Sequence, residues 1–259
     1  MQRVSLTVIL GSDTMRALTP NCWFDDQDDP IHGLISLPDP VMELAGEFEA
    51  LPDDPYCRHR QRRFSQFRVT HTDAGWTHKL LPRRAHIQDR TYNHAVGGIL
   101  RYLQPLQIDA TAVIDCARRA FRQQRGSDWH VDVHQWRMNC PLANQVESVP
   151  EGLHRDGHQF VAIFVINRSN ISGAVTCVQD ASGNTLFKDV VDSGQGMILD
   201  DRRALHHTSE LVAPLLDGHR DIFVICANEW KTRRYGEAFE LACQMDKSVE
   251  PPTSGTLIN

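Results

Sequence analysis

Apolar and polar residues alternate with different periods in different parts of the chain. Over residues 108–123 the apolar side chains recur about every 3.6 positions, as they do on one face of a helix, and Asp109 can cap its start. A second helix is predicted close to the end, over residues 236–245. We expect these two segments to be the helices that flank the rest of the fold.

After the first helix the pattern changes to short runs rich in β-branched and aromatic residues, separated by turn signals. The tripeptide Ser182-Gly183-Asn184 is a hairpin signal because Gly and Asn tolerate positive φ, and it joins two runs of similar length. The second half therefore predicts antiparallel strands over residues 131–138, 160–166, 174–179, 186–191, 196–199 and 222–227.

Many short strands with few helices predict a mainly β fold with flanking α-helices, a double-stranded β-helix of the jelly-roll or cupin type. The chain has 259 residues, a length that all-β folds reach as one unit. We therefore expect a single domain over residues 1–246, with its core jelly roll at 130–228 and a tail over 247–259. Residues 4–10 predict a first strand among the N-terminal additions of helices and strands.

Composition and charge narrow the classes of function. The chain is 41% hydrophobic and 23% charged, as globular proteins are, and its apolar runs are far shorter than the roughly 18 residues of a membrane span. The net charge of -6 disfavours binding to a phosphate backbone. Seven scattered cysteines without a Cys-x-x-Cys pair predict reduced thiols in the cytoplasm. We expect a small-molecule partner, no nucleic acid and no membrane, and allow for a homodimer.

Histidine and aspartate recur as His-x-Asp, which places an imidazole and a carboxylate on the same face of a strand. Composition alone gives about one such pair, so a single match is weak evidence. The sequence contains four of them: His71/Asp73, His130/Asp132, His154/Asp156 and His219/Asp221.

A 2-His-1-carboxylate iron site on this fold requires a second histidine from a later strand, and one of the four pairs is followed by such a histidine. His154 and Asp156 are followed by four strand-like segments and then by His206, at a spacing of 52 residues. The pair His130/Asp132 remains a competitor, because the same later histidine could serve it.

Arg220 lies 14 residues after His206, at the start of an apolar strand. A guanidinium group can hold a carboxylate through two parallel hydrogen bonds, so Arg220 is a candidate anchor for the distal carboxylate of a co-substrate. An isolated arginine in this position would be a solvated strand end. Its place after the distal histidine favours the anchor.

The order of these motifs resembles the Fe(II)- and 2-oxoglutarate-dependent dioxygenases that hydroxylate free amino acids in bacteria, such as L-isoleucine 4-hydroxylase and its relatives. The resemblance covers about two thirds of the chain, over residues 58–228. The ordered set is specific, although each piece alone is not. The matching pieces are Cys57-Arg58-His59-Arg60, Tyr92-Asn93, Gly97-Gly98 with Arg101, Val133-His134-Gln135-Trp136-Arg137, His154-Arg155-Asp156-Gly157, Leu205-His206 and Arg220-Asp221-Ile222.

The resemblance implies a chemistry and a set of ligands. It implies Fe(II), 2-oxoglutarate as co-substrate and O2, with hydroxylation of an unactivated C–H bond of a free L-amino acid such as isoleucine, proline or pipecolic acid, giving succinate and CO2. His154, Asp156 and His206 are then the iron ligands. Co-substrate binding falls to Arg220 and Gln135, and the candidates for substrate binding are Arg137, Arg58, Arg60, Tyr92 and Arg101.

Two local features refine these expectations. In the family a small or apolar residue and a Thr-Pro pair follow the distal histidine, whereas here His207 follows it. Because adjacent residues of a strand face opposite sides, only one of His206 and His207 can bind the ion. The alignment with the family favours His206. On the strand at 131–138 the polar pair Gln135 and Arg137 is expected to face the barrel interior, with His134 on the other face.

Two other classes of function remain open from the sequence. A cupin-like metal-dependent hydrolase or isomerase would use the same barrel without Arg220. A non-catalytic β-barrel binding protein would make the His-x-Asp pairs incidental. A requirement for 2-oxoglutarate excludes the first, and iron-dependent succinate formation excludes the second.

Overall fold

The structure is a computed structural model that describes residues 8–9, 30–94, 96–121, 128–149 and 151–245. The predicted tail over 247–259 lies outside the described residues, as does most of the predicted first strand, of which Val8–Ile9 forms β1. No helix in the described ranges is long and apolar enough to cross a membrane.

Eight strands form the main sheet, in the order β1-β2-β11-β7-β14-β5-β3-β4. Every pair of neighbours in it is antiparallel. Strands β2, β3 and β4 come from the first third of the chain, so the sheet extends beyond the predicted core at 130–228. Beside β1, its strands are β2 (His32–Ser36), β3 (Arg60–Thr72), β4 (Gly75–Leu80), β5 (Asp128–Cys140), β7 (Phe160–Ser169), β11 (Gln195–Asp200) and β14 (Gly218–Glu229).

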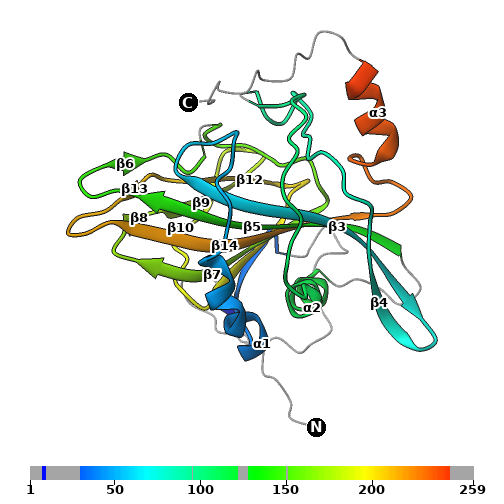
Figure 1. Cartoon of the computed structure of the whole chain (residues 1–259), viewed down its shortest axis with the longest axis horizontal. Helices are drawn as coiled ribbons and strands as arrows, with labels where there is room; N and C mark the ends of the chain where they lie inside the picture. Colours follow the sequence, from blue (N-terminus) through cyan, green and yellow to red (C-terminus); the bar gives the residue numbers. More distant parts are fainter. Residues whose placement is uncertain (1–7, 10–29, 95, 122–127, 150, 246–259) are drawn as a thin grey trace.

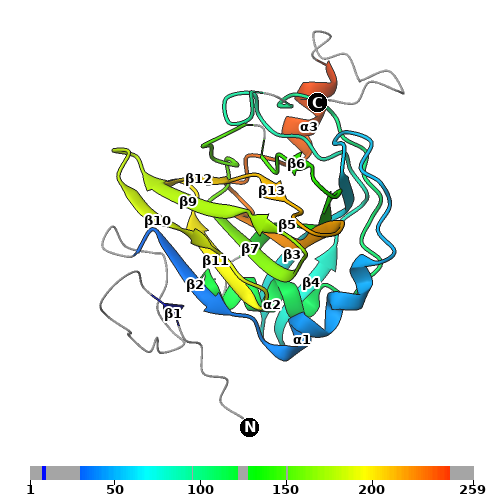
Figure 2. The same cartoon turned by 90° about the vertical axis from the view of Figure 1, so that its left-hand side faces the viewer.

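Two three-stranded sheets cover one face of the main sheet and close the jelly roll, as Figure 2 shows. One has the order β10-β9-β12 and the other β6-β13-β8. Their strands are β6 (Gln145–Val146), β8 (Ser172–Gly173), β9 (Val175–Asp180), β10 (Thr185–Val190), β12 (Ala204–Thr208) and β13 (Leu211–Val212). The mainly β double-stranded β-helix predicted from the sequence is confirmed.

The first two helices, α1 and α2, cover the opposite face of the main sheet (Figure 1). Helix α2 (Thr111–Ala120) buries the apolar stripe predicted for it, and Asp109 accepts a hydrogen bond from the Thr111 N–H at 2.9 Å. The short α1 (Asp39–Met42) runs into a 3-10 turn, η1 (Glu43–Phe48), on the same face. Helix α3 (Glu237–Met245) lies where the second helix is predicted.

The central strands are apolar on both faces because both faces are covered. Along β7, Val161 and Ile163 belong to the cluster that faces the small sheets, while Ala162 and Phe164 belong to the cluster under the helices. The apolar residues of β14 alternate between the same two clusters. This is why these strands appear in the sequence as uninterrupted apolar runs.

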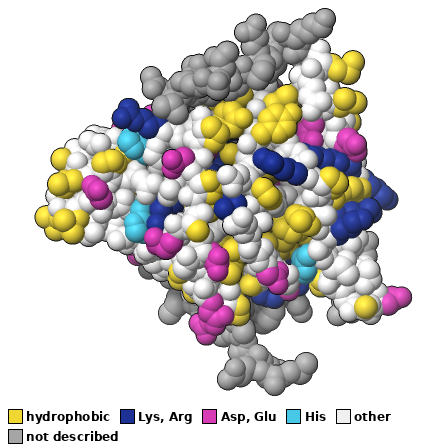
Figure 3. Space-filling view, viewed as in Figure 1, with side chains coloured by type: hydrophobic (Ala, Val, Ile, Leu, Met, Phe, Trp, Pro, Cys, Tyr) yellow, Lys and Arg dark blue, Asp and Glu magenta, His cyan; other side chains and the backbone are white. Residues whose placement is uncertain are grey.

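Loop chemistry agrees with the predicted hairpin between β9 and β10. Gly183 has φ of +86°, and the Asp180 carboxylate accepts backbone N–H groups from Ser182 and Asn184. On the outer surface basic, acidic and apolar side chains are interspersed (Figure 3). Exposed leucines, among them Leu216 at 62% exposure, lie in the loop between β13 and β14.

Packing between η1 and the main sheet should contribute strongly to stability. Phe223 is fully buried on β14 and contacts Phe48 edge-on, with 5.0 Å between the ring centroids. We expect Phe223→Ala to lower the free energy of unfolding by about 3–5 kcal/mol, because the emptied space cannot refill. Urea denaturation measures this change. The exposed Leu216→Ala should stay within about 0.5 kcal/mol, and equal losses in the two variants would contradict the assignment of Phe223 to the core.

Candidate metal and co-substrate site

Main-chain pairing brings the two candidate histidines together. His154 lies in the loop before β7 and His206 on β12, and they form an isolated antiparallel bridge with N–O distances of 3.0 and 2.9 Å. On β12 His206 is buried, on the same side of the strand as Ala204 and Thr208, while His207 is half-buried on the other side. His206 therefore faces the interior of the barrel.

The three candidate ligands form a compact cluster. The Nε2 atom of His154 lies 3.6 Å from Oδ1 of Asp156, and Nε2 of His206 lies 3.5 Å from Oδ2 of the same carboxylate. The other ring nitrogen of His154, Nδ1, lies 2.9 Å from the Gly152 carbonyl, to which it donates, so the neutral ring that binds a metal has its lone pair on Nε2. Although burial opposes ionisation, the two imidazoles hold the pKa of Asp156 well below its usual range.

Two imidazoles and one carboxylate are the donor set of non-haem iron sites that keep positions open for co-substrates. Within the described residues, one other group of metal-ligating side chains is this compact: His86, Asp132 and His134. However, the Arg62 guanidinium donates to Nδ1 of His134 at 2.7 Å, so the ring proton is on Nε2 and that nitrogen has no lone pair for a metal. The site at His154 fits iron better.

A third carboxylate, Asp201, supports the cluster from behind. It accepts the backbone N–H groups of Asp156, Gly157 and His158 at 3.1, 2.8 and 2.9 Å, and its Oδ1 lies 3.8 Å from Nδ1 of His206. Burial, and next the charge of Asp156, raise the pKa of Asp201 to about 6. Asp201 thus holds the loop that carries His154 and Asp156, and its carboxylate lies close to the ring of His206.

Gly157 permits the close packing of this loop. Its φ is +84°, and an added Cβ would lie 2.4 Å from the Tyr235 hydroxyl oxygen and 2.7 Å from the Tyr92 ring. The Tyr235 hydroxyl donates to the Asp156 carbonyl at 3.0 Å. A side chain at position 157 would displace both tyrosines and the loop.

The cluster opens into a cavity of about 330 Å³ that Arg220 lines from β14. Arg220 is 3% exposed, and its Nε and Nη2 atoms have no hydrogen-bond partner among the described residues. Burial, and next the charge of Arg168 on the neighbouring strand, lower the pKa of Arg220 to about 9. An unpaired buried guanidinium is a site for an anionic group, and a carboxylate can accept two parallel hydrogen bonds from it.

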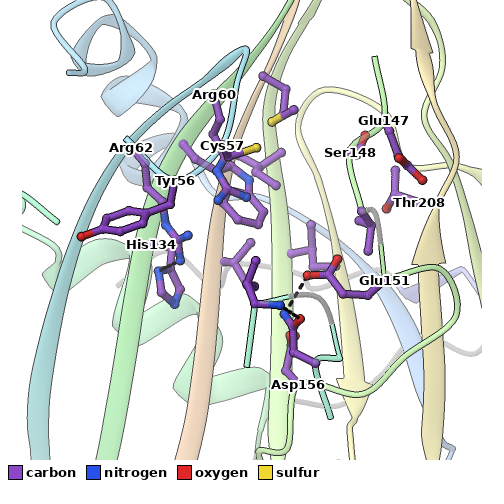
Figure 4. A pocket seen from close by; sticks show the side chains of 18 of the residues that line it. Tyr56, Cys57, Arg60, Arg62, His134, Glu147, Ser148, Glu151, Asp156 and Thr208 are labelled. Carbon is purple, nitrogen blue, oxygen red and sulfur yellow. Dashed lines mark hydrogen bonds between the residues drawn. The ribbon is translucent and has the colours of Figure 1, made fainter. Parts of the chain in front are cut away.

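A second group of arginines lines the same cavity, Arg60 and Arg62 from β3 (Figure 4) and Arg101 from the segment before α2. Arg62 and Arg101 are both 3% exposed, and the Nε atom of each is buried without a hydrogen-bond partner in the described structure. Arg60 donates to the buried Asp54 at 2.7 Å, and Arg62 lies 3.8 Å from the same carboxylate. Two guanidinium groups thus share the buried Asp54 carboxylate, while Arg101 donates to Oε1 of Gln88 at 2.8 Å.

Among the predicted substrate-binding residues, Arg60 and Arg101 lie deep in the cavity, and Arg58 lines it although it is exposed. Strand β3 begins only at Arg60, because His59 has φ of +64°. Tyr92 is not part of the cavity wall; its hydroxyl accepts a hydrogen bond from Arg234 at 3.2 Å.

The predicted orientation of β5 is wrong. Gln135 faces the helix-covered side and donates to the Glu47 carbonyl at 3.1 Å. Arg137 makes a bidentate pair with Asp221 at 2.7 and 2.9 Å and also binds Glu49. These partners hold both side chains away from the cavity. Alternate residues therefore face the cavity instead, namely His134, Trp136 and Met138.

Sequence reasoning missed several cavity residues. Arg62 is not among them, because Arg58, Arg60 and Arg62 alternate in the sequence and an extended strand presents them on one side; Arg60 and Arg62 both line the cavity. Gln88, which donates to Oδ1 of Asp156 at 3.2 Å, has no local signal because its partner is 68 positions away. The same holds for Glu151, whose partner Asn93 is 58 positions away.

Substituting His206 and His207 one at a time should show which of the two histidines binds the iron. We expect His206→Ala to abolish the visible charge-transfer band that Fe(II) and 2-oxoglutarate give in anaerobic titration, because one of three ligands is lost. His207→Ala should keep the band, since His207 lies on the other side of β12. A band that survives in the His206 variant and disappears in the His207 variant would reverse the assignment.

Asp201 and Asp200 make a matched pair of buried carboxylates. Asp201→Asn should weaken Fe(II) binding by about 10–100-fold, the usual effect of losing a group that orients a metal ligand. Asp200→Asn breaks ion pairs with Arg202 and Arg203 instead and should leave Fe(II) affinity nearly unchanged. Anaerobic Fe(II) titration with thermal unfolding of both variants tests this, and equal affinities would refute the role of Asp201.

Comparison with known proteins agrees with this geometry. A bsmA homolog from Methylobium petroleophilum PM1 superposes with a TM-score of 0.63 at 26% identity, covering 74% of this chain and 82% of that one. IDO from Bacillus thuringiensis gives a TM-score of 0.60 at 15% identity, covering 76% and 93%, which supports the shared fold. No curated protein matches the sequence. The family model for 2OG-Fe dioxygenases matches residues 45–226, so the chain belongs to the 2OG-Fe dioxygenase family.

Proposed function

We propose that this protein hydroxylates an unactivated C–H bond of a free L-amino acid, aliphatic or cyclic. As a member of its family it uses Fe(II), 2-oxoglutarate and O2. The observation that carries the choice of substrate is the second group of arginines, Arg60, Arg62 and Arg101, in the same cavity as the candidate ligands. Since Arg220 serves the co-substrate, these arginines are available for a carboxylate on the substrate.

His154, Asp156 and His206 would hold the iron, and Arg220 would bind the distal carboxylate of 2-oxoglutarate. When bound, this centre supplies the oxidising chemistry that converts 2-oxoglutarate and O2 to succinate and CO2 while one oxygen atom enters the substrate. The side chains of this protein position the reactants and exclude water from the cavity. Apolar side chains on the inner faces of β6, β7 and β14 line the cavity, namely Val146, Ile163, Ile222 and Val224.

Charge and size both favour a small carboxylate. Burial, and next the charge of Arg60, lower the pKa of Arg101 to about 10, which reflects positive groups that lack enough counter-charge. A carboxylate would pair with the free Nε atoms of Arg62 and Arg101. The cavity of about 330 Å³ is near the lower end of the range for small-molecule sites, so co-substrate and substrate together must be compact.

A substrate screen tests the proposal. Enzyme with Fe(II), 2-oxoglutarate and O2 is incubated with L-isoleucine, L-proline, L-pipecolic acid and the other common L-amino acids. We expect succinate formation stimulated by one or a few of them, together with a product heavier by one oxygen atom in mass spectrometry. Succinate that no amino acid stimulates, with no oxygenated amino acid, would refute this substrate class.

The role of Arg220 can be tested separately. Arg220→Leu should weaken 2-oxoglutarate binding by about 10–150-fold, the effect of losing hydrogen bonds to a charged group. The control ligand is 2-oxobutyrate, which has the chelating 2-oxo acid but no distal carboxylate. Its affinity should be similar in wild type and variant, as measured by anaerobic titration. A variant that loses both ligands equally would place Arg220 outside the distal carboxylate site.

A further inference from the structure

Glu151 lies at the junction between the candidate iron ligands and the arginines. It is in the loop between β6 and β7, three positions before His154, and it lines the cavity. Figure 4 shows Glu151 and Asp156 on one side of the cavity, with Arg60, Arg62 and His134 on another side. A carboxylate in this place faces the volume in which a substrate would lie.

The position of Glu151 is fixed by a rigid amide. Its Oε1 accepts a hydrogen bond from Nδ2 of Asn93 at 2.7 Å. Asn93 is 3% exposed, donates also to Oε1 of Gln88 at 3.0 Å, and accepts the Val96 N–H at 2.8 Å. With all these bonds made, Asn93 holds the Glu151 carboxylate in one orientation.

Glu151 is close to positive groups without being paired to one. Its charge acts on Arg60, Arg101 and His154. Even so, within the described part of the chain no ion pair of 4.0 Å or less joins it to an arginine, whereas Asp54 contacts both Arg60 and Arg62. The guanidinium groups are therefore balanced mainly by Asp54, and Glu151 can accept hydrogen bonds from another cation.

We propose that Glu151 binds the α-ammonium group of the substrate while Arg62 and Arg101 bind its carboxylate, so that the cavity selects zwitterionic α-amino acids over carboxylic acids that lack the amine. This inference rests on the proposed function and deepens it. The two ends of the zwitterion meet opposite charges on two sides of the cavity, which leaves the side chain of the substrate to face the iron ligands. Glu151 is then a determinant of specificity that contacts the substrate directly.

The test compares pairs of carboxylic acids with closely matched size and shape, one with and one without the amine nitrogen. L-proline is paired with cyclopentanecarboxylic acid, L-pipecolic acid with cyclohexanecarboxylic acid, and any other active amino acid with its des-amino acid. Wild type, Glu151→Gln and the control Glu147→Gln are compared. Glu147 lines the same cavity but is exposed and has no bond to Asn93 in the described structure. Binding is measured by calorimetry in the anaerobic complex with Fe(II) and 2-oxoglutarate, and turnover by succinate formation.

We expect wild type and Glu147→Gln to prefer the amino acid by about 10–150-fold, the effect of a hydrogen bond to a charged group. Glu151→Gln should lose most of this preference, through weaker binding and a higher KM with little change in kcat, while its affinity for Fe(II) and 2-oxoglutarate and its Tm stay close to wild type. Glu151→Asp, which keeps the charge, should restore part of the preference.

The outcomes separate the two proposals. If amino acids are hydroxylated and Glu151→Gln keeps the wild-type preference, the ammonium site is refuted while the proposed function stands. If wild type binds the amine-free acids as well as the amino acids, the ammonium site is again refuted. If wild type neither binds nor oxidises any amino acid, the proposed function itself fails, and the inference fails with it.

Discussion

The candidate site depends on one piece of main-chain pairing, the antiparallel bridge between His154 and His206. Its two hydrogen bonds join the loop before β7 to β12, which belongs to a different sheet. Because Asp156 follows two residues after His154, the bridge also sets the distance from the carboxylate to both imidazoles. Asp201 strengthens the same junction, since it binds the N–H groups of the loop and lies beside the His206 ring. The main-chain hydrogen bonds therefore bring the three candidate metal ligands together.

Buried arginines are the second constraint on function. Removing a charge from water costs several kcal/mol unless a partner compensates for it. Arg62, Arg101 and Arg220 each retain buried guanidinium nitrogens without a partner in the described structure. Arg220 belongs to β14, whereas the other two belong to β3 and to the loop before α2. Positive charge in two places within one small cavity favours the binding of two separate carboxylate groups.

The elements that depend on local sequence pattern could be predicted from the sequence. Helix α2 (Thr111–Ala120), predicted over 108–123, and the strands after it follow from periodicity. The cluster of His154, Asp156 and His206 follows from motif order on the predicted fold. The orientation of β5 could not be predicted the same way. Gln135 and His134 alternate correctly, but the strand is buried on both faces, so alternation does not say which face meets the cavity. Arg137 decides the matter by pairing with Asp221 on the neighbouring strand.

Hydrogen bonds between residues far apart in the sequence could not be predicted either. They join an arginine of the cavity to a candidate iron ligand. Gln88 accepts from Arg101 at 2.8 Å and from Asn93 at 3.0 Å, and it donates to Asp156 at 3.2 Å. Since a guanidinium can only donate and an ionised carboxylate can only accept, the Gln88 amide has a single orientation. Through Asn93 the same amide is connected to Glu151. A chain of hydrogen bonds therefore connects Arg101 and Glu151 to Asp156, a candidate iron ligand, through the amides of Gln88 and Asn93.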